Sequence, residues 1–425
     1  MTAPDPVAAP RLHALDGLRG VAVMGILLMN VNAFAMPFAA YDNPANYGPA
    51  RWPDLALWAA EFVLVDGKLR AIFSALFGAS LLLVADRAEA AGRSPSRTSI
   101  ARLGTLLLFG LAHACLVWGG DILVLYALVG LVALPLRRLP VERLLVMAAL
   151  LLVFQAAILL AHYQGLAALR HAATASDAAP QTLRLWREVL DTLGPPAPAA
   201  LAADLRLHHG PWTALAAGLS HDEPAVVLAE LLFNGPETLG LMLLGMAGLR
   251  SGFLAGHWSH ARYGRAARFA YFLGLPPVVA MAGWLLVAGL PPLATAALTD
   301  LGALPCRWLV AFGHASLLLP WLARDRGRLR MRIVAAGRMA FSNYLGTSLL
   351  MTFLFEGWGL GLYGRIERWA LLPFVFLAWA AMLAWSAPWL RHLRHGPLEW
   401  AWRSLARGQP MPMRRNAIAN TSHPQ

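Results

Sequence analysis

The chain has 425 residues, of which 58% are apolar and only 14% are charged. Soluble domains carry about 25% charged residues, so the composition excludes an ordinary soluble protein and favours an all-α bundle of membrane helices. The two cysteines, Cys115 and Cys306, lie inside apolar segments, which argues against a disulfide framework and a cysteine-based metal centre. The net charge of +12 does not indicate a nucleic-acid partner, because the basic residues gather in alternate loops.

Ten apolar segments follow one another along the chain. Each predicts a transmembrane helix, which needs about 20 mostly apolar residues. The segments are 15–37, 62–85, 102–118, 121–136, 143–163, 228–249, 268–289, 298–321, 335–356 and 369–390. The third and fourth are short and are separated only by Gly119 and Gly120, so we expect a tight helical hairpin there.

The arginines orient these spans, because lysine and arginine stay on the cytoplasmic side in short loops. With a cytoplasmic N terminus, the loops that hold most of the 35 basic residues all lie inside. Residues 324–338 alone carry six arginines, whereas the loops at 119–120 and 290–297 carry none. We therefore expect ten spans surrounded by the lipid bilayer, with both chain ends in the cytoplasm.

The long segment 164–227 divides the chain into two five-span halves, 11–163 and 228–408. Residues 409–425 are expected to form a disordered cytoplasmic tail. Within the long segment, residues 181–193 place apolar side chains on one side at helical spacing. This pattern indicates a helix that either lies in the outer membrane interface or packs as a small lid on the bundle.

One histidine near a membrane boundary has a carboxylate close by in the sequence. A charged group inside a span costs about 2.5–3.5 kcal/mol on insertion scales, so each one is a candidate functional site. His113 lies near the outer end of the third span, and Asp121 follows across the hairpin turn. A histidine beside a carboxylate can act as an acid or base, with the carboxylate fixing its tautomer. These two residues are the candidate catalytic pair; the alternative is a neutral histidine bonded to a neighbouring backbone group.

A second polar group lies in the C-terminal half. Asp300, Arg307 and His314 are seven residues apart, and seven steps of about 100° return a helical side chain to nearly the same face. The sixth span offers counter-charges on one face, at Glu230, Asn234 and Glu237. These six residues predict a buried polar cavity that binds an anionic substrate or relays protons; the alternative is a structural ion pair.

Two smaller groups lie at the ends of the first and second spans. Asp16, Arg19 and Asn30 fall within one sector of the first helix, where Asp16 and Arg19 form a local ion pair in the simpler interpretation. Lys68 and Arg70 enter the second span from outside, and the simpler interpretation is that both reach back to the interface. All five are candidate substrate-binding residues.

The ninth span adds Asn343 and Tyr344 to the candidate substrate-binding residues, although hydrogen bonding between helices explains them equally well. The sequence has no Walker-type loop, no HExxH motif and no glycine-rich turn between a strand and a helix. It also has no close cluster of histidines and cysteines. We therefore expect no metal site, no direct use of ATP and no bound cofactor.

Spaced motifs occur in both halves of the chain. In the N-terminal half they are Leu15–Gly20, Gly25–Asn30, Gly67–Arg70, Phe77–Gly78, Gly110–His113, Trp118, Asp121–Leu123 and Tyr126. In the C-terminal half they are Gly337–Leu345 and Gly396–Arg403. In this order they resemble the YeiB-like family of bacterial inner-membrane proteins, whose C-terminal part is known as domain of unknown function 418. The resemblance extends over residues 11–408 and is weakest in 164–227.

The N-terminal motif is also similar to that of transmembrane acyltransferases, including heparan-α-glucosaminide N-acetyltransferase. The resemblance implies transfer of an acyl group from cytoplasmic acyl-coenzyme A, as co-substrate, to an extracytoplasmic small-molecule or glycan acceptor. His113 would then be base or nucleophile, oriented by Asp121. Arg307 and His314 would hold the anionic part of the substrate, and the arginine-rich inner loops would attract the coenzyme A phosphates.

Two other functions remain open at this point. A secondary transporter of a small anionic solute would use the same buried charges as a substrate or proton path. A non-catalytic partner of other envelope proteins would instead use the long outer segment. The oligomeric state is also open, with a homo-oligomer among the alternatives.

Overall fold

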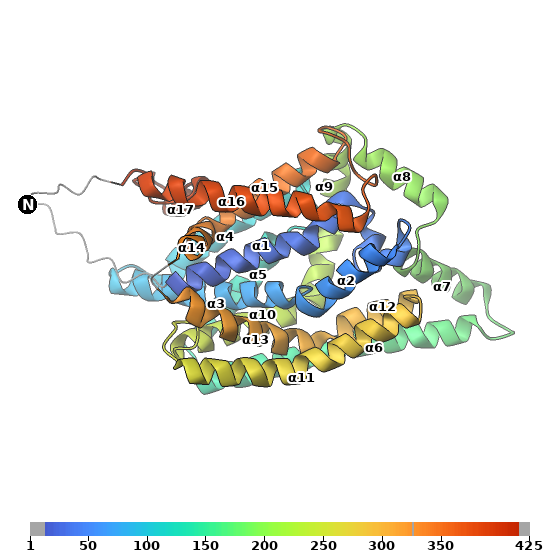
Figure 1. Cartoon of the computed structure of the whole chain (residues 1–425), viewed down its shortest axis with the longest axis horizontal. Helices are drawn as coiled ribbons and strands as arrows, with labels where there is room; N and C mark the ends of the chain where they lie inside the picture. The colour runs from blue at the N-terminus through green and yellow to red at the C-terminus, as the bar shows by residue number, and fades with distance from the viewer. Residues whose placement is uncertain (1–12, 325–326, 416–425) are drawn as a thin grey trace, which may run out of the picture.

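The computed structural model describes residues 13–324 and 327–415, and within these residues all named elements are helices (Figure 1). The all-α prediction is confirmed. The N-terminal half holds α1 His13–Ala35, α2 Trp52–Leu64, α3 Lys68–Ala90, α4 Pro95–Leu116, α5 Leu123–Leu136 and α6 Val141–Ala173. The outer segment holds α7 Pro180–Leu193, α8 Pro198–His208 and most of α9 Trp212–Phe233. The remainder holds α10 Gly235–Arg250, α11 His260–Val287, α12 Pro292–Ala297, α13 Leu304–Leu322, α14 Arg328–Arg338, α15 Ala340–Phe355, α16 Leu372–His392 and α17 Pro397–Arg407.

Within the described residues, six helices are long and apolar enough to cross a membrane, or up to eight if each bent pair counts as one span. A single helix needs about 20 residues to cross the hydrocarbon core. Two of the ten expected spans correspond to shorter helices, α5 with 14 residues and α15 with 16 residues. The structure therefore agrees with the predicted bundle of membrane helices. By length and composition alone, fewer than the ten predicted helices qualify as membrane spans.

The second expected span, 62–85, begins too early. The chain breaks after α2, and Gly67 adopts a left-handed conformation with φ of 66° before α3 begins at Lys68. Glycine takes this conformation at little cost because it has no Cβ. The break places Lys68 and Arg70 in the first turn of α3, inside the bundle rather than at its edge.

Two pairs of helices bend sharply where polar residues lie. The helix axis turns by 58° between the second half of α9 and α10, and by 50° between the α12 segment and α13. The second bend follows a short π-helix, η3 Leu298–Gly302, and π-helical turns are frequent at functional sites. These bends leave backbone carbonyls without helical partners beside the buried charges.

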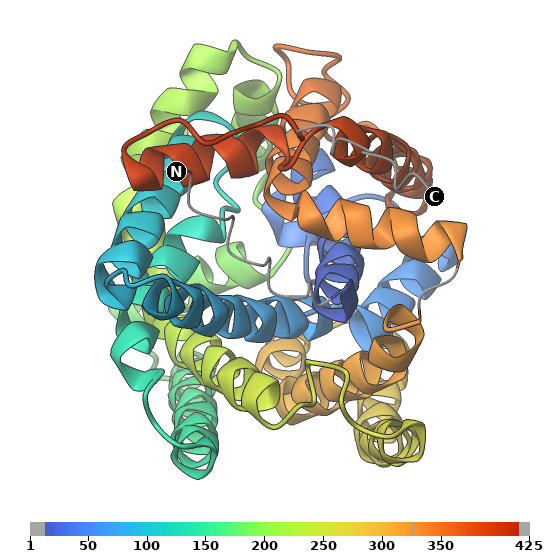
Figure 2. The same cartoon turned by 90° about the vertical axis from the view of Figure 1, so that its left-hand side faces the viewer.

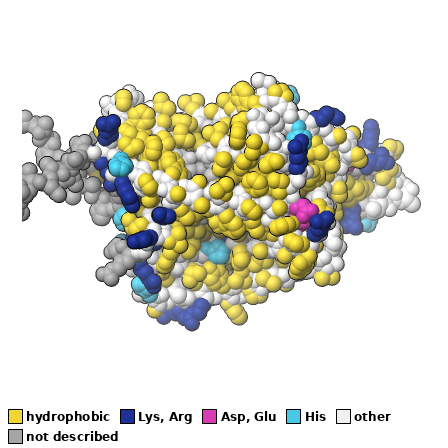
Figure 3. Space-filling model, turned by 45° about the horizontal axis from the view of Figure 1, so that its top comes forward, with side chains coloured by type: hydrophobic (Ala, Val, Ile, Leu, Met, Phe, Trp, Pro, Cys, Tyr) yellow, Lys and Arg dark blue, Asp and Glu magenta, His cyan; other side chains and the backbone are white. Residues whose placement is uncertain are grey.

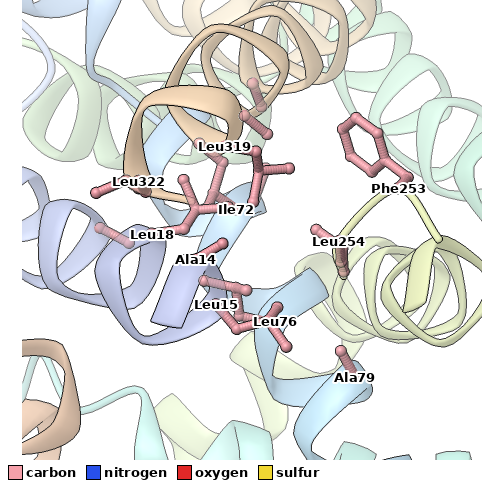
Figure 4. Packing of buried hydrophobic residues seen from close by; sticks show 14 of the residues in the cluster. Ala14, Leu15, Leu18, Ile72, Leu76, Ala79, Phe253, Leu254, Leu319 and Leu322 are labelled. Atoms are coloured by element: carbon pink, nitrogen blue, oxygen red, sulfur yellow. The ribbon is translucent and has the colours of Figure 1, made fainter. Parts of the chain in front are cut away.

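The core of the bundle forms where α1, α3 and α13 meet (Figure 4). Leu18 of α1 lies against this cluster, which also contains Leu76 and Leu319. Small residues allow close helix crossings nearby. A Cβ atom on Gly245 of α10 would lie 1.7 Å from the backbone oxygen of Ala75 in α3, so only glycine fits at that crossing.

The outer surface is apolar over the middle of the molecule, with arginines towards its ends (Figure 3). Several large apolar side chains point fully outward, including Val287 at 90% and Phe272 at 77% exposure. Contiguous apolar surface of this kind is rare on a soluble monomer and marks a surface that contacts lipid or another protein. Because several helices are also long and apolar enough to span, lipid is the matching environment.

The start of α1 and the whole of α17 lie at one end of the bundle, together with α14 (Figures 1 and 2). The helices α7 and α8 lie at the opposite end (Figure 1). The helix expected over 181–193 is present as α7, and it contacts α6 and α12 without burying any residue completely. Both interpretations of it, interfacial helix and lid, therefore stay open.

Residues 409–415, the first part of the expected disordered tail, make specific hydrogen bonds. The backbone amide of Arg394 donates to the oxygen of Met413 at 2.9 Å, and the indole of Trp400 donates to the oxygen of Met411 at 2.7 Å. These bonds hold the segment beside α17. The rest of the expected tail, 416–425, lies outside the described residues.

Candidate functional site

The histidine and carboxylate of the hairpin form a buried pair. His113 Nδ1 lies 2.8 Å from Asp121 Oδ1, and both side chains are 2% exposed. The second oxygen of Asp121 accepts a hydrogen bond from the amide of Val124 at 2.8 Å, which holds the carboxylate at the start of α5. An ionised Asp121 accepts from Nδ1–H, so this pairing leaves Nε2 as the unprotonated nitrogen of a neutral imidazole.

The other ring nitrogen of this histidine has no partner. Nε2 of His113 is buried and makes no hydrogen bond within the described residues. Tyr344 of α15 packs against the same ring with 5.4 Å between ring centroids, and its hydroxyl is also buried and without a partner. Buried polar atoms are normally satisfied, so these two atoms, which have no partner among the described residues, indicate a place for water or a ligand. The structure thus brings together His113 of α4, Asp121 of the turn before α5 and Tyr344 of α15.

A second polar centre gathers around Glu237 of α10. Its carboxylate receives Arg70 at 2.9 Å and lies 3.6 Å from Arg307. The indole of Trp308 donates to the other oxygen at 2.7 Å, and Arg70 also donates to Asn234 at 3.1 Å. Glu237 is therefore the residue of the sixth expected span that lies opposite Arg307. Two guanidinium groups thus share this carboxylate, and the charges of Glu230 and Asp66 also act on Arg70.

Arg307 is held in place by backbone as well as by charge. One guanidinium nitrogen donates to the oxygen of Thr299 at 3.2 Å, in the π-helical turn. A Cβ atom on Gly67 would lie 2.1 Å from Nε of Arg307, so the guanidinium rests directly on the glycine turn before α3. The motif residues Gly67 and Arg70 thus both contribute to this centre.

The seven-residue spacing predicts that Asp300, Arg307 and His314 lie on one helix face. The structure does not place them on a common face. The π-helical turn and the 50° bend change the helical phase between Asp300 and the other two. Asp300 instead accepts from Tyr163 of α6 at 2.6 Å, while His314 lies 2.8 Å from the hydroxyl of Tyr271 in α11. Each of the three therefore has a different helix as its partner.

A tyrosine of α5 lies between the two polar centres. The hydroxyl of Tyr126 is 2.7 Å from that of Ser74, which donates to the backbone oxygen of Arg70 at 3.0 Å. Tyr126 stands in the first turn of α5, close to Asp121 in sequence. The hydroxyl pair therefore connects the helix that begins at the histidine site with the helix that carries Arg70.

A third centre at the outer end was missed by the sequence analysis. Arg368 donates to Glu61 at 3.0 Å, and Asn32 of α1 donates to the same oxygen at 3.4 Å. Arg368 also lines a cavity of about 350 Å³ together with Asp54 and Tyr47. The only signal in the sequence was Asn32, because Glu61 and Arg368 lie at expected span boundaries where charges are common.

Lys68 does not reach the interface, as snorkelling would require. It is fully buried and its ammonium group donates to the backbone oxygen of Phe62. Asp16 and Arg19 do form the local pair, at 2.9 Å, and Arg19 also donates to Ser80 of α3 at 2.7 Å. Asn30 lies about three turns further along α1 and is half-buried.

The ninth expected span contains one strong contact between helices. The amide of Asn343 donates to Ser386 of α16 at 3.2 Å and accepts from the indole of Trp385 at 2.9 Å. In the sixth expected span, at the end of α9, the carboxylate of Glu230 accepts a hydrogen bond from the amide of Asn234 at 2.9 Å. These bonds fix helix positions, so Asn343 is a packing residue in the geometry, whereas its neighbour Tyr344 faces the histidine site.

A further histidine centre links the outer segment to the bundle. His208, the last residue of α8, lies 3.0 Å from Glu356 and 3.5 Å from Asp204, and its ring stacks on Tyr363 at 3.9 Å. Burial alone would lower the pKa of His208, but the hydrogen bonds and charges of the two carboxylates outweigh it and raise the pKa to about 9. No sequence pattern indicates this centre, because Glu356 lies 148 positions after His208 along the chain.

Similar proteins place the chain in a family without a described activity. The C-terminal region, residues 249–409, matches the model of a protein family of unknown function, DUF418. Over 96% of its length the chain is 35% identical to the uncharacterized protein YeiB of Escherichia coli (strain K12), of which it covers 98%. It is 28% identical over 93% of its length to the uncharacterized protein YxaH of Bacillus subtilis (strain 168), with 94% of that protein covered.

An uncharacterized 39.9 kDa protein of Bacillus acidopullulyticus, from the amylase 3′ region, is 24% identical over 96% of the chain and is covered to 98%. No solved structure matches the chain. The near-complete coverage of YeiB includes both halves and the outer segment between them. The chain is therefore a member of the YeiB-like family that carries the DUF418 region.

Proposed function

We propose that the chain is a ten-pass inner-membrane acyltransferase that moves an acyl group from cytoplasmic acyl-coenzyme A to an extracytoplasmic acceptor. The observation that carries this proposal is the buried, unpartnered Nε2 of His113, whose ring Asp121 holds from the other side. A neutral imidazole fixed in this way is suited to general-base catalysis. The resemblance of the N-terminal motifs to transmembrane acyltransferases supplies the reaction class.

The membrane arrangement follows from charge and from the end of the bundle that each helix occupies. α14, with its arginines, and α17 share one end, which we assign to the cytoplasm by the positive-inside rule (Figure 1). The short helices α5 and α15 then cross as the fourth and ninth spans, within protein rather than against lipid alone. Most of α5 is buried, including Tyr126, which supports this assignment.

The proposed reaction needs one proton to move twice. The acceptor hydroxyl or amine attacks the thioester carbonyl carbon while Nε2 of His113 takes its proton. The carbon–sulfur bond then breaks, and the same proton passes to the departing thiolate. Asp121 would stabilise the imidazolium in between, and the hydroxyl of Tyr344, whose ring packs on that of His113, would donate to the oxyanion that forms.

The second centre would bind the charged part of a substrate. Arg70 and Arg307 share the single carboxylate of Glu237, so an anionic group would complete their neutralisation. In this proposal His314, whose ring is held by the hydroxyl of Tyr271, also helps to bind the substrate. The transporter alternative rests on the same observation, because buried charge networks also form proton and solute paths.

Acyl transfer can be tested with purified protein and radiolabelled acetyl-coenzyme A. Wild type should release thiol and transfer label, while His113→Ala should lose the reaction by about a hundredfold or more. His171→Ala is the matched control, because His171 is exposed at the end of α6. A His113→Ala protein that elutes and melts normally yet transfers at the wild-type rate would exclude this mechanism.

The transporter alternative has its own readout. Proteoliposomes containing wild-type protein would be loaded with a mixture of labelled organic anions, and both efflux and covalent change would be followed. Efflux without any covalent change, lost in Glu237→Gln, favours transport. Thiol release without efflux favours acyl transfer.

A further inference from the structure

Helix α17 fixes one arginine of α4 at the end of the bundle where α1 begins (Figure 2). The indole of Trp402 donates to the backbone oxygen of Arg102 at 2.8 Å. The guanidinium carbon of Arg102 lies 4.4 Å from the centre of the Trp402 ring, a favourable cation–π arrangement. The position of the Arg102 charge is therefore set by packing between the N-terminal and C-terminal halves.

This charge has no opposite charge to balance it. Arg102 is only half-buried, and within the described residues its side chain makes no ion pair or hydrogen bond. The strongest charges acting on Arg102 all belong to other arginines, namely Arg403, Arg407, Arg19 and Arg87. We call these five residues the arginine cluster. They come from α1, α3, α4 and α17, so four helices converge to form it.

Arg403 adds an unused donor to the arginine cluster. Its Nη1 lies 3.3 Å from Nδ1 of His395, while its Nε is buried and has no partner. Burial lowers the pKa of Arg403, the charge of Glu399 opposes this, and the charges of Arg19 and Arg87 add to the decrease. Like charges held together in this way raise the free energy of the empty site, and a bound anion would lower it.

The charges of Asp16 and Glu399 act on Arg403 of the arginine cluster, but within the described residues neither carboxylate forms an ion pair with Arg102 or Arg403. Asp16 is occupied by Arg19 at 2.9 Å. Glu399 points instead to the start of α15, where it accepts from the amide of Phe341 at 2.8 Å and from Ser342. The guanidinium groups of Arg102 and Arg403 are thus left for a ligand, and guanidinium matches phosphate through paired hydrogen bonds.

We propose that the arginine cluster is a binding site for a phosphate-bearing anion at the cytoplasmic end of the bundle. The ligand chemistry is that of a nucleotide bisphosphate or of a phospholipid headgroup. Its use as the docking site of an acyl-coenzyme A rests on the proposed acyl transfer, whereas phosphate binding itself does not. The two can therefore fail separately.

Binding is measured by calorimetry with adenosine 3′,5′-bisphosphate and purified protein in neutral detergent. The wild-type protein should bind, and Arg102→Gln should raise Kd by about tenfold or more, as expected for one charge-assisted contact. Arg97→Gln is the matched control, because Arg97 is an exposed arginine near the same end of α4 as Arg102. Equal affinity in wild type and Arg102→Gln would overturn the proposal.

A second variant keeps the test decisive if Arg102→Gln does not fold. Arg102→Lys preserves the charge but not the planar pair of donors, so it should weaken binding by a smaller, still measurable factor. Each variant is accompanied by a melting curve with and without the bisphosphate. The ligand-induced rise in melting temperature should shrink in both variants, and an undiminished rise would contradict the proposal.

The two sources of phosphate are separated in nanodiscs. Protein is placed in discs of phosphatidylcholine alone or with phosphatidylglycerol, and the bisphosphate titration is repeated. Bisphosphate binding that is equal in both discs supports a soluble ligand, whereas binding suppressed by phosphatidylglycerol supports a lipid headgroup at the same arginines. The absence of bisphosphate binding in both discs, together with no effect of phosphatidylglycerol on melting, would overturn the site.

Discussion

At the scale of single residues, the ring of His113 contacts both the carboxylate of Asp121 and the ring of Tyr344. His113 and Asp121 flank a two-glycine turn, so their proximity follows from local sequence. Tyr344 comes from a helix more than 200 residues later, and only the tertiary structure brings its hydroxyl to His113. The unused Nε2 also depends on packing that no local pattern encodes.

Replacing Asp121 by asparagine tests the tautomer argument. Asparagine keeps an oxygen for the amide of Val124 but no longer stabilises a protonated His113. Acyl transfer should fall by about a hundredfold, within the range of acid–base catalysis, while the melting temperature changes little. A thiol-release assay beside a melting curve measures both. An unchanged rate would show that the pair is only structural.

Replacing Glu237 by glutamine tests the second centre. The change removes the carboxylate that both Arg70 and Arg307 contact, so the free energy of unfolding should drop by about 3–5 kcal/mol. Denaturation in mixed detergent micelles measures it. Glu230→Gln is the control, since Glu230 accepts only from Asn234 and should cost about 1 kcal/mol. Equal losses in the two variants would argue against a shared counter-charge.

At the scale of helices, apolar length predicted most elements but not their breaks. The helix α2 was missed because its apolar end runs into the next segment, and only the left-handed Gly67 separates the two. The π-helical turn at Leu298–Gly302 likewise left no pattern. From the sequence, Asp300 and Arg307 are therefore expected on one helix face. The π-helical turn and the bend between them change the direction in which the two side chains point.

The close crossing of α3 and α10 gives a prediction with a matched control. Gly245→Ala should destabilise by about 1–3 kcal/mol or more, because its Cβ would overlap the backbone of Ala75. Gly264→Ala, in α11 with open space around it, should instead stabilise by up to about 1 kcal/mol through helix propensity. Unfolding in detergent compares them. The same sign in both variants would contradict the crossing geometry.

The contact between α8 and the end of α15 predicts a pH dependence. His208 has its pKa raised from 6.5 to about 9 in the folded protein, so its stabilising contribution is fully present below pH 6.5 and is lost as pH rises through 9. Melting temperature should therefore fall over this range, and less so in His208→Asn. His209→Asn, which removes a neighbouring bond to Tyr363, should keep the wild-type slope. Parallel slopes in all three proteins would refute the ion pair.

At the scale of the whole molecule, the overall architecture could be predicted mainly from the charge of the loops and the apolar character of the segments. The apolar outer surface and the basic end that carries α14 and α17 (Figures 1 and 3) follow directly from composition and loop charge. The polar centres of the interior do not, because Glu61 with Arg368, or Arg70 with Glu237, join positions 160 or more residues apart. Long-range pairs of this kind need the packed structure.

The central claim is that the buried histidine transfers an acyl group across the membrane. Inverted membrane vesicles expose the cytoplasmic face, so labelled acetyl-coenzyme A added outside meets the proposed donor side, while native acceptors remain in the lumen. We predict stoichiometric thiol release outside and covalent label inside the vesicle, both lost in His113→Ala and kept in His171→Ala. Label that enters without thiol release, or that is retained at the wild-type rate in His113→Ala, would contradict the account.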